Sequence, residues 1–141
     1  MEPENAILSA EEARALTMAR EIQRRAYAPY SGKQVGAAVI SADGRVFTGC
    51  NVENAADELG VCAERHAIAA AVIAGREEFL TVIVVSPDDR LWPPCRFCRT
   101  VIREFVTDID VIMASQNGCI RRARLADLGD RPFTDGHRES C

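Results

Sequence analysis

Three cysteines in two short motifs place the strongest constraint on how this chain can fold. Cys62 is followed by Ala63 and Glu64, and Cys95 and Cys98 stand three residues apart farther along the sequence. Each motif opens a segment that is expected to be helical, and residues three apart in one helical turn point the same way. The three sulfurs can meet if the two helices begin side by side, as helices do when they pack across parallel strands.

Size and composition favour a single globular domain over residues 1–141. With 48% hydrophobic residues, the chain can bury a real core and lies far from the composition of disordered proteins. The formal net charge is −4 and no basic run occurs, so we expect no nucleic-acid partner. The first residues are acidic and polar, and no apolar run approaches the length of about 18 residues typical of a membrane span. We therefore expect no membrane association and a cytoplasmic location.

Short alternating elements predict an α/β fold. Ser9 and Glu12 have the spacing of a capping box, which predicts an amphipathic helix from about Ser9 to Ala26. Asp43-Gly44 between two apolar runs is a hairpin signal, and the β-branched run 80–85 is typical of a central strand. The other expected elements are strands at 35–40, 45–50, 109–114 and 119–125, a helix at 62–74 and a helix that starts at Pro93-Pro94. Together they predict a three-layer α/β/α sandwich with a five-stranded mixed sheet.

The two cysteine motifs predict a zinc site with one open position. A helix N-terminus lowers the pKa of a nearby thiol, so Cys95 and Cys98, three residues apart at the start of one helix, are expected to favour the thiolate form. Three sulfurs at about 2.3 Å from one zinc ion leave the fourth tetrahedral corner for water. Glu64 is close enough to move protons at that corner without binding the ion, which is the task of hydrolytic deamination. Arg65 and Arg99 are the candidates for hydrogen-bonding the sulfurs and offsetting their excess negative charge.

Other interpretations of the cysteines and histidines stay open from the sequence. A lone Cys-x-x-Cys pair is also found in redox sites and in structural zinc sites. A fourth cysteine, Cys50 or Cys119, could complete the coordination and make the zinc purely structural. Cys141 is expected to be exposed and incidental, and His66 and His137 are expected to be surface, core or tail residues rather than ligands. Disulfides are disfavoured because a chain able to bury a good core does not need them.

Several short segments that together span nearly the whole chain carry a family pattern. They are Tyr30-Ser31, Val35-Gly36-Ala37-Ala38, Asp43-Gly44, Gly49 to Ala55, Cys62-Ala63-Glu64-Arg65, Pro94-Cys95 and Cys98-Arg99. In order and spacing they resemble the small zinc cytidine deaminases. The resemblance implies the cytidine deaminase fold, hydrolysis of cytidine and deoxycytidine, and a homotetramer whose active sites are completed by neighbouring subunits. It also implies one zinc ion per subunit held by Cys62, Cys95 and Cys98, with Glu64 as the proton carrier.

The same resemblance indicates which residues bind the substrate. Asn51 and Glu53 fall where the family holds the ribose, and alternating residues at the end of a strand face the same way. The backbone N–H of Ala63 would meet the edge of the base, and Phe133 corresponds to an aromatic residue that packs on the base from a neighbouring subunit. The other interpretation of Asn51 and Glu53 is a polar loop capped by its own side chains.

Four residues depart from the family pattern around the expected substrate site. Lys33, Arg96 and Thr100 stand where the family usually has phenylalanine, glycine and glutamine, and Asp57 falls in a stretch that usually reads Ser-Tyr-Gly. Lys33 and Arg96 could offer positive charge to an acidic group, and Asp57 could meet a cationic group. Alternatively, Lys33 and Asp57 pair with each other or face solvent.

Three functions are therefore weighed. The main expectation is deamination of cytidine or deoxycytidine. The alternative is deamination of a modified cytosine nucleoside, such as a blasticidin-S-like antibiotic or a charged cytidine derivative. A non-catalytic, zinc-stabilised interaction protein that keeps the same fold is the lesser alternative.

Overall fold

The computed structural model of the chain describes residues 5–128 and 139–140. The helices are α1 (Ala10–Gln23), α2 (Ala63–Ile73) and α3 (Arg96–Phe105), with short 3-10 turns η1 (Asp57–Leu59) and η2 (Leu125–Leu128). The strands are β1 (Gly36–Ser41), β2 (Val46–Cys50), β3 (Phe79–Val85), β4 (Arg90–Leu91), β5 (Asp110–Ala114), β6 (Ile120–Arg124) and β7 (Glu139–Ser140).

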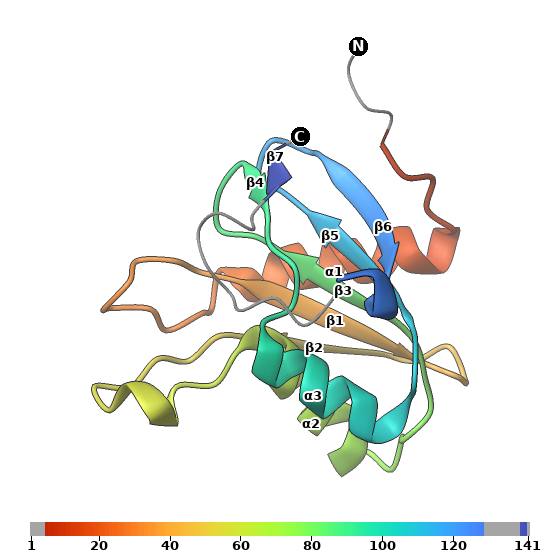
Figure 1. Cartoon of the computed structure of the whole chain (residues 1–141), viewed down its shortest axis with the longest axis horizontal. Coiled ribbons are helices and arrows are strands. Elements are labelled where there is room, and N and C mark those ends of the chain that lie inside the picture. Colours follow the sequence, from red (N-terminus) through yellow and green to blue (C-terminus); the bar gives the residue numbers. More distant parts are fainter. Residues whose placement is uncertain (1–4, 129–138, 141) are drawn as a thin grey trace.

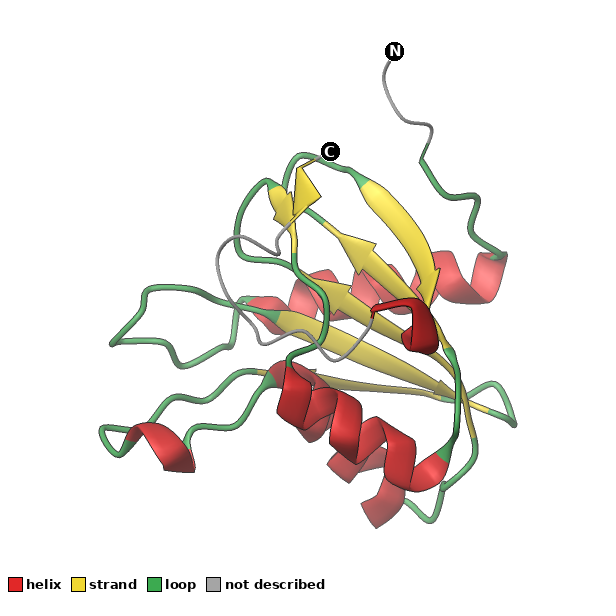
Figure 2. Ribbon diagram, in the orientation of Figure 1, coloured by secondary structure: helices red, strands yellow, loops and turns green. Residues whose placement is uncertain are grey.

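Five of the strands form one mixed sheet between two layers of helices. Their order is β2-β1-β3-β5-β6, in which β3 and β5 are parallel and the other neighbours are antiparallel. Helix α1 covers one face of the sheet, and α2 and α3 pack on the other (Figures 1 and 2). The predicted three-layer α/β/α sandwich is confirmed. The two-residue strands β4 and β7, which the sequence did not predict, pair separately.

The predicted local signals at the first helix and the hairpin are present. The Ser9 hydroxyl accepts a hydrogen bond from the Glu12 N–H, and the Glu12 side chain accepts one from the Ser9 N–H, which completes the capping box. Helix α1 ends at Gln23 rather than at Ala26, because the chain tightens there into turns closed by hydrogen bonds three residues apart. Gly44 adopts the positive φ of 85° that the β1–β2 turn requires.

The central strands are buried on both faces. In β1, Ala37 and Val39 pack toward α2 and α3, while Ala38 and Ile40 pack toward α1. This double burial explains why β1 and β3 read as nearly continuous apolar runs rather than as alternating patterns. The core is therefore one sheet with an apolar cluster on each side, and the helices that carry the cysteine motifs belong to the same side.

Small residues let α2 lie unusually close to the edge strand β2. Gly49 faces the first turns of the helix, and a Cβ placed there would lie only 2.5 Å from both the Ala63 carbonyl oxygen and the Ala67 nitrogen. A side chain of any size at this position would push the helix away from the sheet. The glycine thus fixes where the N-terminus of α2, and with it Cys62, sits.

Helix α3 begins later than the sequence predicted. Cys95 has extended backbone angles of φ −67° and ψ 169° and is the N-cap, so the helix starts at Arg96 and not at Pro93-Pro94. Helix α3 connects the parallel strands β3 and β5. This connection brings the N-terminus of α3 to the carboxyl end of β3, where catalytic residues of α/β sheets commonly lie.

Within the described ranges, no helix combines the length and the apolar character needed to cross a bilayer.

Candidate metal centre and active site

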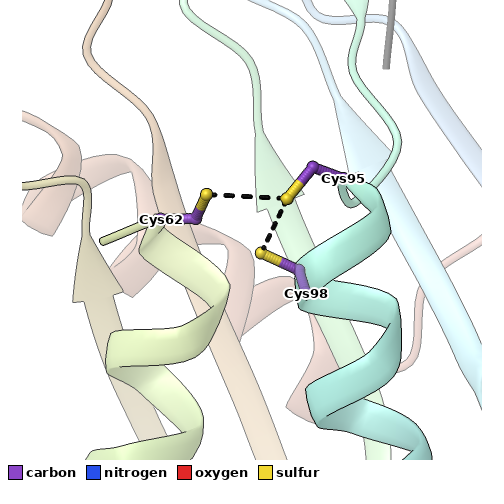
Figure 3. Close-up of side chains that lie close together, drawn as sticks. All are labelled: Cys62, Cys95 and Cys98. Carbon is purple, nitrogen blue, oxygen red and sulfur yellow. Dashed lines mark hydrogen bonds between the residues drawn. The ribbon is translucent and has the colours of Figure 1, made fainter. Parts of the chain in front are cut away.

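The N-termini of α2 and α3 bring three cysteine sulfurs together. Cys62 is the N-cap of α2 and Cys95 the N-cap of α3, and neither side chain is used to cap its own helix. Cys98 lies in the first turn of α3, and the three side chains point toward one another (Figure 3). The Cys95 sulfur is 3.6 Å from that of Cys62 and 3.4 Å from that of Cys98, and all three lie within 4.8 Å of one another.

These distances fit a shared metal ion and exclude a disulfide between any two of the three cysteines. A disulfide would bring two sulfurs to about 2.05 Å, and all three cysteines are free thiols. Three sulfurs bound tetrahedrally at about 2.3 Å from one zinc ion are separated by about 3.8 Å, close to the two separations above. Sulfur ligands in this geometry are typical of zinc, so the donor set is suited to hold that ion.

Without a cation, the three thiols differ in how readily each loses its proton. Hydrogen bonding from Cys62 lowers the pKa of Cys95 to about 2, while hydrogen bonding to Cys95 raises the pKa of Cys62 to about 12. Hydrogen bonds to Cys62 and Cys95, together with burial, raise the pKa of Cys98. The cluster therefore holds one negative charge readily and resists a second and a third. A divalent cation is what would allow all three thiolates to coexist.

Glu64 lies in the first turn of α2 with its side chain turned into the protein. Glu64 is only 5% exposed, although a carboxylate is rarely buried without a specific role. Burial is the main cause that raises its pKa to about 7; the charge of Cys95 raises the pKa further, whereas a hydrogen bond with Cys98 lowers it. A carboxyl group with a pKa near neutrality can both accept and donate a proton, so its environment suits general acid–base chemistry beside the sulfurs.

The two arginines expected around the sulfurs have different environments. The Arg65 Nη2 donates a hydrogen bond to the Gly60 carbonyl at 3.1 Å and lies 4.0 Å from the Cys62 sulfur. Its guanidinium therefore connects the loop before α2 to the cluster. Arg99 is buried in α3 and donates to the Leu128 carbonyl at 3.4 Å. A role for Arg99 at the sulfurs stays a prediction.

The alternative of a fourth protein ligand finds no support among residues 5–128. The cluster of side chains able to hold a metal contains Cys62, Cys95 and Cys98 and no further cysteine, histidine or carboxylate of the described chain. Cys119 lies in the apolar core near the β5–β6 turn and is disulfide-bonded, so it offers no thiolate to a metal, and the expectation that this chain forms no disulfide is wrong. The Nδ1 atom of His66 is 2.7 Å from the carbonyl oxygen of Cys50, so His66 is used in packing α2 against the end of β2.

Asn51 ties the end of β2 to the segment that precedes β1. Its Oδ1 accepts a hydrogen bond from the Val35 N–H at 2.8 Å, and its Nδ2 donates to the Lys33 carbonyl at 2.9 Å. Both ends of the amide are thus bonded within the chain, as the loop-capping interpretation describes. Binding of a ribose by Asn51 stays a prediction, and it would require these bonds to be shared or exchanged.

Glu53 holds the same segment two residues farther along. Its carboxylate accepts hydrogen bonds from the N–H groups of Tyr30 and Ser31, at 3.0 and 3.1 Å, and from the Ser31 hydroxyl at 2.5 Å. The hydroxyl is the main cause that lowers the Glu53 pKa, so this side chain is ionised at neutral pH. A carboxylate has more acceptor positions than these three bonds use, so Glu53 can still accept a bond from a sugar hydroxyl.

An open hollow of about 340 Å³ lies next to Glu53. It is lined by residues of the 53–60 loop and of the segment before β1: Tyr30, Ser31, Glu53, Asn54, Ala55, Asp57 and Gly60. Asp57, the first residue of η1, lines the same hollow as Glu53. The Arg65 hydrogen bond to Gly60 links the rim of this hollow to the sulfur cluster.

The remaining predicted residues lie at the surface or outside the described chain. The Lys33 ammonium lies 5.3 Å above the ring of Trp92, and no ion pair with Asp57 is found among the described residues. Arg96 and Thr100 are exposed on α3, where the Thr100 hydroxyl donates to the Arg96 carbonyl at 3.0 Å. Phe133, together with His137 and Cys141, falls outside the described residues.

The geometry and the sequence agree with one family. The profile of the cytidine and deoxycytidylate deaminase zinc-binding region matches residues 9–115. The chain belongs to this family. It is therefore a zinc-dependent hydrolytic deaminase, and its cluster of three cysteines is suited to hold the ion.

Relatives of the deaminase match over most of its length. The cytidine deaminase of Halalkalibacterium halodurans is 39% identical over 124 residues, which is 86% of this chain and 94% of that protein. The crystal structure of a cytidine deaminase from Burkholderia pseudomallei superposes with a TM-score of 0.79 at 36% identity, covering 89% of this chain and all of the other. The blasticidin-S deaminase of Bacillus cereus is more distant, at 29% identity over 108 residues, 71% of this chain and 76% of that protein.

Sequence reasoning missed two residues that organise the deaminase site. The Ser31 hydroxyl donates a hydrogen bond to the Glu53 carboxylate. The ring of Trp92, just before the motif that contains Cys95, contacts the Lys33 ammonium. A signal for Trp92 was present, because it is the single tryptophan of the chain and directly precedes the two prolines before Cys95. No local pattern pairs Ser31 with a carboxylate 22 residues away.

Proposed function

We propose that this protein removes the amino group of cytidine and deoxycytidine by hydrolysis of its bond to the ring carbon, releasing ammonia and the uridine products. The observation that carries the proposal is the buried carboxyl group of Glu64 directly beside three sulfurs at the N-termini of two helices. Three protein ligands leave one position of a tetrahedral ion open for chemistry, whereas a structural site would be closed by a fourth. The relatives named above act, by their names, on this class of nucleoside.

The proposed roles divide the reaction among a few residues. Cys62, Cys95 and Cys98 hold the zinc ion, which when bound supplies an activated water for attack on the ring carbon that carries the amino group. Glu64 takes a proton from the attacking water and passes it to the ring nitrogen. It then carries the next proton to the departing amino group, which leaves as ammonia. The pKa of Glu64 near 7 supports both transfers, because neither protonation state is strongly favoured at neutral pH.

The other proposed contacts hold the nucleoside in place. The N–H of Ala63, in the first turn of α2, has no acceptor within its own helix and is available to the base edge. Asn51 and Glu53 would bind the ribose while they hold the 30–35 segment. Arg65 would offset the excess negative charge of the three thiolates, since its guanidinium already lies 4.0 Å from the Cys62 sulfur.

We further propose that the enzyme works in the cytoplasm as a homotetramer with shared active sites, and that Phe133 packs on the base in a neighbouring subunit. Large apolar side chains that stay exposed around the site support assembly, because such patches mark interaction surfaces. They are Tyr27, Tyr30, Val52, Leu59 and Phe97.

Glu64→Gln tests the proposed function. The purified variant and the wild type are incubated with cytidine and deoxycytidine, and loss of the cytosine ultraviolet band is followed. Glu77→Gln is a matched control, since Glu77 is an exposed carboxylate after α2. We expect Glu64→Gln to lose about 10²- to 10⁴-fold in rate with its fold and zinc content intact. A wild type that releases no ammonia from either nucleoside, or a fully active Glu64→Gln, would refute the proposal.

A modified cytosine nucleoside is the second candidate substrate. The charged residues Asp57 and Lys33 stand near the proposed ribose contacts, and a relative is a blasticidin-S deaminase. The same ultraviolet assay with acidic and aminoacylated cytosine nucleosides decides between the candidates. Poor turnover of cytidine combined with efficient turnover of a charged analogue would favour this alternative.

A further inference from the structure

The single lysine and the single tryptophan of the chain lie against each other at the edge of the site. Lys33 is the one lysine among 17 basic residues, and Trp92 is the one tryptophan. The Lys33 Nζ atom lies 5.3 Å from the centre of the Trp92 ring. At that distance an ammonium group is attracted by the electron-rich face of the indole, which is the strongest aromatic partner for a cation.

Both partners are fixed by the chain around them. The backbone of Lys33 is held on one side by Asn51 and on the other by the Ser31 hydroxyl, which accepts from the Lys33 N–H at 3.0 Å. Ser31 is in turn bonded to Glu53. Lys33 therefore belongs to the 30–35 segment, which is held by hydrogen bonds to Asn51 and Glu53, the two proposed ribose contacts.

Trp92 lies on the segment that leads to Cys95, on the side of the sulfur cluster. It is only 9% exposed, and its indole N–H donates to the Asp88 carboxylate at 3.1 Å. The ring is thus held rigidly three residues before Cys95, on the segment that leads into α3. No carboxylate of the described chain forms an ion pair with Lys33, so the indole face has no such competitor for the ammonium.

We propose that Lys33 is a positioning residue of the deaminase. Its ammonium, seated on Trp92, fastens the 30–35 segment to the segment that carries Cys95, and so sets the distance between the ribose contacts and the sulfur cluster. This inference rests on the proposed function, because it takes the nucleoside to span from Asn51 and Glu53 to the cluster. Loss of the positive charge should weaken substrate binding more than the chemical step.

The single lysine allows a test on the folded wild-type protein. Acetylation removes the charge of Lys33, whereas reductive methylation keeps it, and both reagents also modify the N-terminal amine. Lys33→Arg treated in parallel controls for that amine, and its guanidinium should largely restore the contact. Steady-state rates with cytidine, zinc content and the emission spectrum of Trp92 are measured on each sample.

Acetylation should raise KM for cytidine about two- to fivefold, change kcat by less than about twofold, leave zinc bound and shift the emission of Trp92. Reductive methylation should leave KM and emission near those of the untreated protein. Unchanged KM on acetylation would overturn the inference. A raised KM without any change in Trp92 emission would also overturn it, because Lys33 would then touch the substrate directly. Absence of turnover in the untreated protein would instead refute the proposed function.

Discussion

Gly49→Ala tests how closely the position of α2 is tied to catalysis. The added methyl group would lie 2.5 Å from the Ala63 oxygen and the Ala67 nitrogen, both of which are backbone atoms. Ordinary contacts of such a carbon begin near 3.4 Å, so the helix must move by about 1 Å away from β2. That movement would carry Cys62 and Glu64 away from the N-terminus of α3.

Two consequences follow from this displacement. Overpacking of this kind costs about 1–3 kcal/mol of the free energy of unfolding, or about 3–10 °C in the midpoint of thermal unfolding for a chain of this size. A displacement of about 1 Å at a catalytic group costs up to about 100-fold in rate. We therefore expect Gly49→Ala to fold, to bind zinc less tightly, and to lose about 10- to 100-fold in kcat for cytidine.

The assay must separate lost geometry from lost stability. Ala69→Gly is the matched control, because Ala69 is exposed on the same helix and glycine there costs about 1 kcal/mol without moving the helix. Thermal unfolding, bound zinc and kcat are measured for both variants. The reasoning is refuted if Gly49→Ala is as active as the wild type, or if Ala69→Gly loses as much activity as Gly49→Ala.

Two other predictions follow from contacts away from the helix–strand packing. The Arg122 side chain is the main cause that lowers the Glu12 pKa from 4.5 to about 2, so this pair stabilises the fold above pH 4.5 and the benefit is lost as pH falls toward 2. Glu12→Gln should therefore lower the free energy of unfolding by about 1 kcal/mol at pH 7 and by much less near pH 2 in urea titrations; an equal loss at both pH values would contradict this. Arg65→Ala should reduce kcat by about 10- to 100-fold with zinc still bound, whereas Arg14→Ala on the exposed face of α1 should not, and an Arg65→Ala enzyme with unchanged kcat would remove Arg65 from the site.

Local sequence signals were sufficient for most of the fold and for the metal cluster. The capping box at Ser9, the turn at Gly44 and the cysteine spacing around Cys95 each act over a few residues, so each can be recognised in the sequence. The start of α3 was placed too early because proline is tolerated in the first turn of a helix, whereas here the two prolines precede the N-cap. Helix ends depend on such balances and are the least certain part of a sequence-based prediction.

Contacts between distant segments explain what the sequence left open. Whether Asn51 and Glu53 face a substrate or their own chain depends on where the 30–35 segment runs, and no local pattern fixes its path. The contact between the Lys33 ammonium and the Trp92 ring joins residues 59 positions apart in the chain, so only the three-dimensional structure reveals it. Both features concern how the 30–35 segment is held in place. Lys33, one of the residues that depart from the family pattern, belongs to the same segment.

X-ray absorption at the zinc edge of the purified wild-type protein would test the account most directly. We predict one zinc ion per chain with three sulfur neighbours at about 2.3 Å and one oxygen neighbour at about 2.0 Å. Four sulfur neighbours would mean a closed structural site, and protein that folds without stoichiometric metal would leave Glu64 with nothing to act upon. Either result would contradict the proposed chemistry.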